Sequence, residues 1–351
     1  MINDNIKKLE AGNDSVNLQA ETINLGIGYE DVKKIALDIF KDNFIKLSEE
    51  ASIIAKERVE EITEEFLVEL YKNKPESIDS MRNPDMQLAI YTVQKEYART
   101  GDKNLSDMLV DILVDRATKK ERDLKQIVLD ESLSIVPKLT SEQIEALTII
   151  FIVKYARRLG ISNLALFNQI IDEVIKPFTG NLTKNRSCYQ HLEYCGCGAI
   201  SSFSIDIEEI FKSSYRSIFS KGFSKEEILN FPKGNIKENQ NLVFFESCWD
   251  KSKIRFIWDN TEEMENILKQ TKWYTEEEIQ KFKEIYTKNS LTNEEIKKYL
   301  LSIGDYMNIL FDIWNNSEMK HMTLTSVGIA IAQANFRRKT GKTIDLSIWI
   351  K

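Results

Sequence analysis

The sequence is poor in the residues that interrupt helices and in those that most often carry catalysis. Its 351 residues include 5 prolines, 13 glycines, 4 cysteines and 2 histidines. So few prolines and glycines argue against a turn-rich β-sandwich and favour long helices. Because His191 and His321 are the only histidines, a Ser-His or Cys-His enzyme has few ways to be built. The common nucleotide-binding, zinc-protease and serine-hydrolase motifs are also missing.

Long apolar runs are absent as well. The longest, ALTIIFIVKYA from Ala146 to Ala156, is shorter than the roughly 18 residues of a membrane-spanning helix and contains Lys154. The first residues, MINDNIKKLEAGNDS, have no apolar signal core. We therefore expect a cytoplasmic protein without membrane association, whose cysteines are free thiols or metal ligands rather than disulfides.

The charge balance argues against a nucleic-acid partner. A net charge of -7 and a pI near 5.3 give no global basic field for phosphate. Four cations, Arg337, Arg338, Lys339 and Lys342, do gather at the end of the last predicted helix. Cations there complement the helix dipole, which accounts for them without a phosphate ligand.

The residues that are present predict a mostly α protein in three parts. Residues 1–28 contain an alternation of apolar and polar side chains next to turn residues, which predicts an N-terminal β hairpin. Residues 29–180 have helical periodicity and predict a bundle. Thr140 with Gln143, and Thr292 with Glu295, predict capping boxes at the starts of two helices. Residues 181–351 predict a smaller α+β domain. Its end, about 292–351, reads strand, helix, turn and strand after a helix, which is typical of a winged-helix-like module.

The bundle begins with an unusually long apolar period. No proline or glycine interrupts the sequence from Tyr29 to Lys72, so one helix of about 40 residues and roughly 60 Å is predicted. Such a helix is longer than a small domain is wide, and an isolated hairpin is only marginally stable. We therefore expect a homo-oligomer formed through the hairpin and this helix.

The densest chemistry lies in CYQHLEYCGCGAI, residues 188–200. Cys188, His191, Cys195 and Cys197 form a C-x2-H-x3-C-x-C pattern, and zinc accepts four such ligands tetrahedrally. Because Cys-x-Cys strains a single tetrahedral centre, no cofactor is favoured and zinc remains an alternative. The preferred interpretation is a structural turn between the bundle and the C-terminal part, where Gly-Cys-Gly permits close backbone approach and the cysteines pack as apolar residues.

The preceding residues allow a second chemical interpretation. Arg186 and His191 in RSCYQH resemble the Arg-x4-His signature of the HEPN superfamily of metal-independent ribonucleases. The resemblance implies a helical bundle in which both residues act on RNA across a dimer. A guanidinium can hold a phosphate, and an imidazole can move a proton near neutral pH. Ser187 departs from the usual Asn, Asp or His, so Arg186 and His191 are tentative catalytic residues of this alternative alone.

An acidic stripe offers a third candidate. Asp107, Asp111 and Asp115 lie four positions apart on one face of a predicted helix, where carboxylates can hold Mg²⁺ between helices. The preferred interpretation is the solvated side of an amphipathic helix, opposite its leucines and isoleucines.

Whole segments of the sequence resemble an uncharacterised family of bacterial proteins. The match covers most of the length and is carried by GNDSVNLQAETI, ALDIFKDNFIKLSEEA, VQKEYARTGDKNLSDMLVDILVDR, PKLTSEQIEALTIIFIVKY, CYQHLEYCGCGAI and LTSVGIAIAQANFRRKTGKTIDLSIWI. GNDSVNLQAETI, residues 12–23, is similar to short motifs ahead of predicted anti-phage effectors. LTSVGIAIA, residues 324–332, resembles the LT-x-x-G turn of abortive-infection proteins of the alpha type. The resemblance implies phage defence or a stress response and carries over no catalytic residues.

Together these observations predict a non-enzymatic, self-associating protein that acts through an unidentified protein partner or phage trigger. The alternative is an RNA-cleaving effector that uses Arg186 and His191 in a dimeric site.

Overall fold

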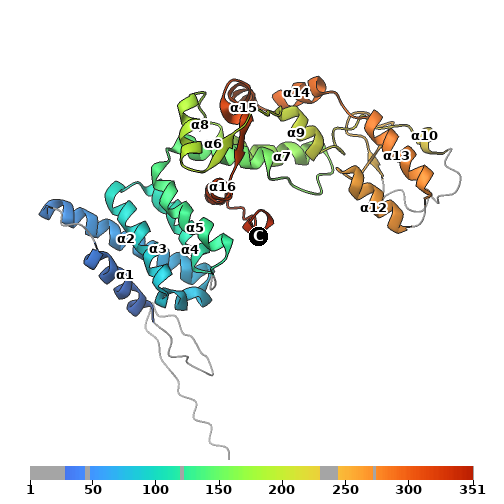
Figure 1. Ribbon diagram of the computed structural model, residues 1–351. Coiled ribbons are helices and arrows are strands. Elements are labelled where there is room, and N and C mark those ends of the chain that lie inside the picture. The colour runs from blue at the N-terminus through green and yellow to red at the C-terminus, as the bar shows by residue number, and fades with distance from the viewer. Residues whose placement is uncertain (1–27, 44–47, 119–121, 230–243, 272–273, 351) are drawn as a thin grey trace, which may run out of the picture.

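The computed structural model describes residues 28–43, 48–118, 122–271 except 230–243, and 274–350. Over these residues the protein is mostly helical, with two small antiparallel sheets (Figure 1), which confirms the predicted class. The predicted N-terminal hairpin falls in residues 1–27 and lies outside the described part. Among the described helices, none is both long enough and apolar enough to cross a membrane.

Helices follow one another along most of the chain, and the short strands all lie in its second half. The first half contains α1 (Tyr29–Asn43), α2 (Glu49–Asn73), the 3-10 helix η1 (Pro75–Arg82), α3 (Pro84–Thr100), α4 (Lys103–Ala117), α5 (Leu124–Ile135), η2 (Val136–Lys138), α6 (Ser141–Lys154), α7 (Leu164–Val174) and η3 (Lys176–Phe178). The second half contains α8 (Arg186–Tyr194), β1 (Gly198–Ile200), α9 (Ile207–Ser214), α10 (Lys225–Leu229), β2 (Phe244–Glu246), β3 (Ile254–Phe256), α12 (Thr261–Thr271), α13 (Glu276–Lys288), α14 (Asn293–Leu301), α15 (Asp305–Asn315), η4 (Glu318–His321), β4 (Met322–Leu324), α16 (Ser326–Thr340) and η5 (Leu346–Ile348).

Local capping sets many of the helix ends. Thr140 and Gln143 form the predicted capping box at the start of α6, and Thr292 and Glu295 form the one at α14. In each box a side-chain oxygen accepts a hydrogen bond from a backbone N–H that would otherwise lack a partner. At the other end, Gly341 takes a left-handed φ of 67° and terminates α16. The capping boxes predicted from sequence are thus confirmed.

The single helix predicted from Tyr29 to Lys72 is wrong. α1 ends at Asn43, and Ser48 has an extended backbone conformation at the start of α2. The two helices pack against each other, and Lys33 of α1 forms a 2.5 Å ion pair with Glu64 of α2. One apolar period continues through both helices because both bury a face in the same body, so periodicity alone could not reveal the break.

The last helix of the chain lies inside the main core. α16 packs against α4, α5 and α6 (Figure 1), and its residues from Gly328 to Phe336 are buried. Asn335 donates a 2.9 Å hydrogen bond to the Thr148 hydroxyl of α6 within this interior. One continuous apolar core therefore joins residues near both ends of the described chain.

The winged-helix-like ending is not confirmed. β4 and α16 form where a strand and a helix were predicted, but β4 pairs with β1 through the register Gly198 to Leu324. The predicted closing strand is wrong, because residues Leu346–Ile348 form a 3-10 helix capped by Asp345. Leu346 and Ile350 are buried against the main core, so the ending packs on the body without adding a strand.

A second, smaller apolar core lies in residues 221–289, which we call the inserted lobe. Its centre contains Phe256 and Phe282, and it includes β2, β3, α12 and α13 (Figure 1). The chain enters and leaves the lobe side by side, since Ser220 and Ser290 form an antiparallel bridge and the Leu291 amide donates to the Phe219 carbonyl at 2.8 Å. The chain therefore enters and leaves the lobe at one place on the body.

Candidate functional site

The Cys-His stretch folds as a short helix followed by a tight turn. After α8, Gly196 takes a φ of 74° and leads into β1. The turn packs on the start of α16: Thr325 donates from its amide to the Cys197 carbonyl at 3.1 Å and from its hydroxyl to the Gly196 carbonyl at 2.6 Å. A β-carbon on Gly328 would overlap the Cys197 carbonyl oxygen. Two segments that carry the family resemblance thus form one contact.

The side chains of this stretch are arranged for packing. The Gln143 amide lies 2.9 Å from Nδ1 of His191, and Cys195 Sγ lies 3.6 Å from Nε2. Burial raises the pKa of Cys188 to about 11 and that of Cys197 to about 12. Gln143 and Cys195 lie beside the two imidazole nitrogens of His191, so zinc bound to this imidazole would have to displace one of these contacts. Within the described residues no cluster of three or more His, Cys, Asp or Glu side chains can hold a metal.

The structure does not bring Arg186 and His191 together within one chain. Both lie on α8, but five positions separate them by about 140° around the helix axis. Arg186 is exposed and forms a 3.1 Å ion pair with Glu318, whereas His191 faces Gln143 of α6. A composite ribonuclease site would therefore need a second copy of the chain.

The acidic stripe and the basic cluster meet each other. Arg337 of α16 forms ion pairs with Asp115 at 2.9 Å and Asp111 at 3.5 Å, and Arg338 lies 3.9 Å from Asp107. These residues line a groove of about 920 Å³ between α2, α4 and α16. The two patterns that the sequence offered as a magnesium site and a phosphate site are thus used for helix packing.

The remaining cations of the basic cluster are also paired. Lys339 forms an ion pair with Glu145, and Lys342 forms one with Glu173. Gln169 supports Glu173 with a 2.9 Å hydrogen bond, and Lys342 is the main cause of the lowered pKa of that carboxyl group. The cluster therefore presents little free positive charge to a nucleic acid.

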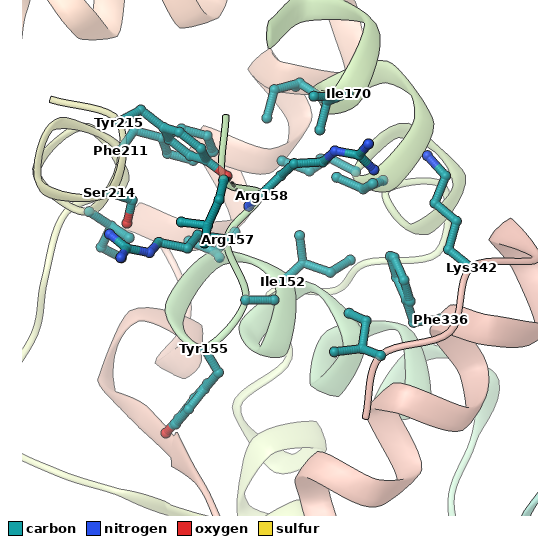
Figure 2. Close-up of a pocket in the computed structure, with 18 of the residues that line it drawn as sticks. Ile152, Tyr155, Arg157, Arg158, Ile170, Phe211, Ser214, Tyr215, Phe336 and Lys342 are labelled. Atoms are coloured by element: carbon teal, nitrogen blue, oxygen red, sulfur yellow. Dashed lines mark hydrogen bonds between the residues drawn. The ribbon is translucent and has the colours of Figure 1, made fainter. Parts of the chain in front are cut away.

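A pocket of about 690 Å³ lies where α6, α7, α9 and the C-terminal segment converge (Figure 2). Its lining is dominated by apolar side chains: Ile152, Val153, Ala156, Leu159, Ile170, Ile171, Val174, Ile175, Ile210, Phe211, Phe336, Ile344, Ile348 and Trp349. The other lining residues are Tyr155, Arg157, Arg158, Ser214, Tyr215, Lys342 and Thr343. Volume and composition are those of a small-molecule site in a protein.

Tertiary packing fixes the walls of this pocket. Beneath it, Phe167 of α7 is fully buried and makes edge-to-face contacts with Phe211 and Tyr215. Trp349 packs edge-on against Phe151 of α6, with ring centroids 5.0 Å apart. Aromatic contacts of this kind add to the apolar burial that holds each wall in place.

The hydroxyl oxygens of two tyrosines near the pocket each accept a hydrogen bond from the backbone. The Arg158 amide donates to the Tyr215 hydroxyl at 3.3 Å, and the Leu324 amide donates to the Tyr155 hydroxyl at 2.8 Å. In Figure 2 the Tyr155 ring points away from the Arg158 side of the pocket. The polar groups left for a ligand are therefore concentrated on the cationic rim.

Two arginines of this rim form no ion pair among the described residues, although Arg157 partly offsets the burial-raised pKa of Asp259 and Arg158 contributes to the lowered pKa of Glu173. Arg157 and Arg158 follow α6 directly and are exposed. Figure 2 shows Arg158 and Lys342 extending toward the same side, while Arg157 extends toward Ser214. Because Lys342 is paired with Glu173, Arg157 and Arg158 are the cations best placed to meet an anionic ligand.

No sequence pattern predicted this pocket. Its lining comes from four separated segments, 152–159, 170–175, 210–215 and 336–349, and each reads as ordinary amphipathic structure. The signal that could have found it was ARR, residues 156–158, a cationic pair shortly after α6, which with α7 is the most apolar of the described helices.

Comparison with known proteins identifies a family but no activity. No curated protein matches the chain, and no solved structure matches it. One protein-family profile, whose description reads only "-like", matches residues 26–350. The match covers all of the described helices and strands. The chain therefore belongs to this uncharacterised family, whose description names no substrate, partner or reaction.

Proposed function

We propose that the protein acts by binding rather than by catalysis, and that the pocket between α6, α7 and α9 is its ligand site. One observation carries the proposal: the lining of about 690 Å³ is apolar with a cationic rim, and it contains no His, Cys, Asp or Glu. Those residue types supply most general acids, general bases and nucleophiles. An apolar site with fixed cations is suited to holding a ligand.

The wider role that we propose is that of a cytoplasmic, self-associating protein of bacterial phage defence or stress response. The resemblance of LTSVGIAIA to abortive-infection proteins supports the biological context. Four free cysteines suit a reducing compartment. Self-association is supported by aliphatic side chains on α2 and α3 that are about half exposed or more, namely Ile53, Ile54, Val68 and Leu88.

Ligand binding is tested by thermal denaturation of the full chain against a library of small metabolites. A ligand that binds only the folded state raises the melting temperature. We expect such a ligand to stabilise the wild type but not Val174→Phe, whose ring fills the pocket from α7. If no compound distinguishes the two proteins, the pocket is not the functional site.

Self-association and context need separate measurements. Size-exclusion chromatography with light scattering is expected to give an oligomer, and a clean monomer at micromolar concentration would overturn this part. Pull-downs from infected and uninfected cells, with the wild type and a Cys188→Ala/His191→Ala variant, then identify the partner. We expect the variant to retain the partner, because the Cys-His turn is structural.

The alternative of RNA cleavage has its own test. It requires Arg186 of one copy to meet His191 of another, and Arg186 is largely exposed on α8. RNA cleavage by the purified wild type that disappears in His191→Ala would replace the binding proposal. We expect neither protein to cleave RNA.

A further inference from the structure

We infer that the ligand of this pocket is a small amphiphile with one apolar tail and one anionic head group, either a carboxylate or a phosphate. The inference rests on the proposed function, because it specifies the ligand class of the same site. It is carried by the distribution of polar groups over the pocket and by the pairing of its cations.

The floor of the pocket selects for a tail. Aliphatic residues form about half of the lining and come from α6, α7, α9 and the segments that follow them, joined by Phe211, Phe336 and Trp349. A polar group buried without a hydrogen-bond partner loses its hydrogen bonds to water without replacement, which weakens binding. The hydroxyl oxygens of Tyr155 and Tyr215 already accept backbone N–H groups, so the floor offers a nucleobase or a sugar few hydrogen-bond partners besides these two O–H donors. An alkyl chain makes no such demand and gains from apolar burial.

The rim selects for an anion. Arg157 and Arg158 follow α6 at the edge of the apolar lining, and neither forms an ion pair within the described part of the chain. By contrast, Arg337 and Lys339 of the basic cluster are closely paired. The protein as a whole carries a charge of -7, so two free guanidinium groups beside a cavity mark a local preference. A guanidinium binds carboxylate and phosphate through parallel N–H donors.

The local charges also set the polarity of binding. Lys342 lies on the same side as Arg158 in Figure 2, but Glu173 neutralises it. Arg158 acts on Glu173 too, although only as a minor contribution to its lowered pKa. Arg157 points toward Ser214, whose hydroxyl can add a donor to the head group. The two guanidinium groups thus lie on different sides of the apolar lining, so the head group lies at one of them, and the tail lies along the floor formed by α6 and α7.

The experiment compares three matched probes on the full chain by calorimetry, each below its aggregation concentration. Decanoate and decyl phosphate carry the anionic heads, and decanol carries the same tail without charge. We expect both anions to bind at least about tenfold more tightly than decanol, a difference of about 1.4 kcal/mol. The preferred anion identifies the head group as carboxylate or phosphate.

A charge variant tests the rim directly. Arg157→Gln/Arg158→Gln is expected to bind decanoate and decanol about equally, with the tail contribution retained. Lys56→Gln/Arg99→Gln removes the same charge from exposed positions on α2 and α3 and is expected to keep the anion preference. All four substituted side chains are exposed, so these variants should fold as the wild type does.

The outcomes separate this inference from the proposed function. Equal binding of all three probes to the wild type, or an anion preference that survives in Arg157→Gln/Arg158→Gln, overturns the head-group assignment and leaves ligand binding intact. Failure of all three probes, together with a metabolite that binds the wild type but not Val174→Phe, overturns the amphiphile class. Failure of every ligand overturns both proposals.

Discussion

Gly328 is the described glycine whose surroundings leave the least room for an added β-carbon. Its α-carbon faces the Cys197 carbonyl so closely that no side chain fits, and backbone cannot move aside as a flexible side chain can. Gly328→Ala must therefore separate α16 from the Cys-His turn. Overpacking of this kind costs about 1–3 kcal/mol, and we expect the upper end because both contacting groups are backbone.

Chemical denaturation measures this loss, and a second glycine supplies the control. Gly180 has open space around the position of a β-carbon. Gly180→Ala is expected to change the free energy of unfolding by less than about 1 kcal/mol, and in the stabilising direction if at all. Equal effects of the two substitutions would show that the contact at Cys197 is not the reason for the glycine.

The buried thiol of Cys197 makes stability depend on alkaline pH. Burial raises its pKa to about 12, from 9.0 in an exposed thiol. The unfolded chain therefore loses this proton first, and the stabilisation, fully present below pH 9, is lost as pH rises toward 12. One such group contributes a slope of up to about 1.4 kcal/mol per pH unit. Cys197→Ala should flatten the decline of unfolding free energy between pH 9 and 11, whereas an unchanged slope would contradict the assignment.

At the scale of the helices, ion pairs join α4 to α16. Arg337 lies between Asp111 and Asp115 and also donates to the Asp111 carbonyl at 3.1 Å. Arg337→Ala leaves two carboxylates facing each other without a cation. We expect the free energy of unfolding at pH 7 to fall by about 2 kcal/mol, as for other charged hydrogen-bonded groups.

The pH dependence of this loss distinguishes electrostatics from packing. Burial raises the pKa of Asp111, and removal of Arg337 raises it further. As pH falls through that pKa, Asp111 becomes neutral and no longer needs the cation. The difference between wild type and Arg337→Ala should therefore shrink at acidic pH. Arg99→Ala, at an exposed pair on α3, should cost less than about 1 kcal/mol at any pH.

The elements also show what the sequence can and cannot predict. Helix ends with capping boxes were predictable because Thr140 and Gln143 satisfy each other locally. The break between α1 and α2 was not, since both helices bury faces of the same period. The acidic stripe on α4 was interpreted as solvated because its partner, Arg337, lies more than 200 positions away in the chain. The pocket failed to appear for the same reason: long-range packing creates it from unremarkable segments.

At the scale of the whole molecule, two apolar cores share one chain. The main core joins α1 through α9 with α14 through α16, and the inserted lobe has its own core around Phe256. Arg255 fastens the lobe to the body. It is fully buried, and its guanidinium donates to the Ser217 hydroxyl and to the Ser162 carbonyl. Ser162 lies four residues after Arg158, so the clamp rests on the segment that follows the rim.

This arrangement predicts that the lobe opens separately from the body. Units with their own core commonly exchange amide hydrogens with their own opening free energy. In native-state hydrogen exchange, amides of α12 and α13 should therefore exchange at a lower free energy than those of α16. Arg255→Ala removes the clamp and leaves its partners unpaired, which should lower the opening free energy of the lobe by about 3 kcal/mol.

The distribution of this effect along the chain decides the interpretation. Lys253→Ala, next to β3 but only part-buried, should leave exchange in α12 and α13 nearly unchanged. If Arg255→Ala destabilises α16 as much as α13, the two cores unfold as one unit and the lobe is not separate. If only the lobe responds, Arg255 is its clamp. An anionic ligand at Arg157 and Arg158 should then protect the lobe as well, because it orders the 157–162 segment on which the clamp rests.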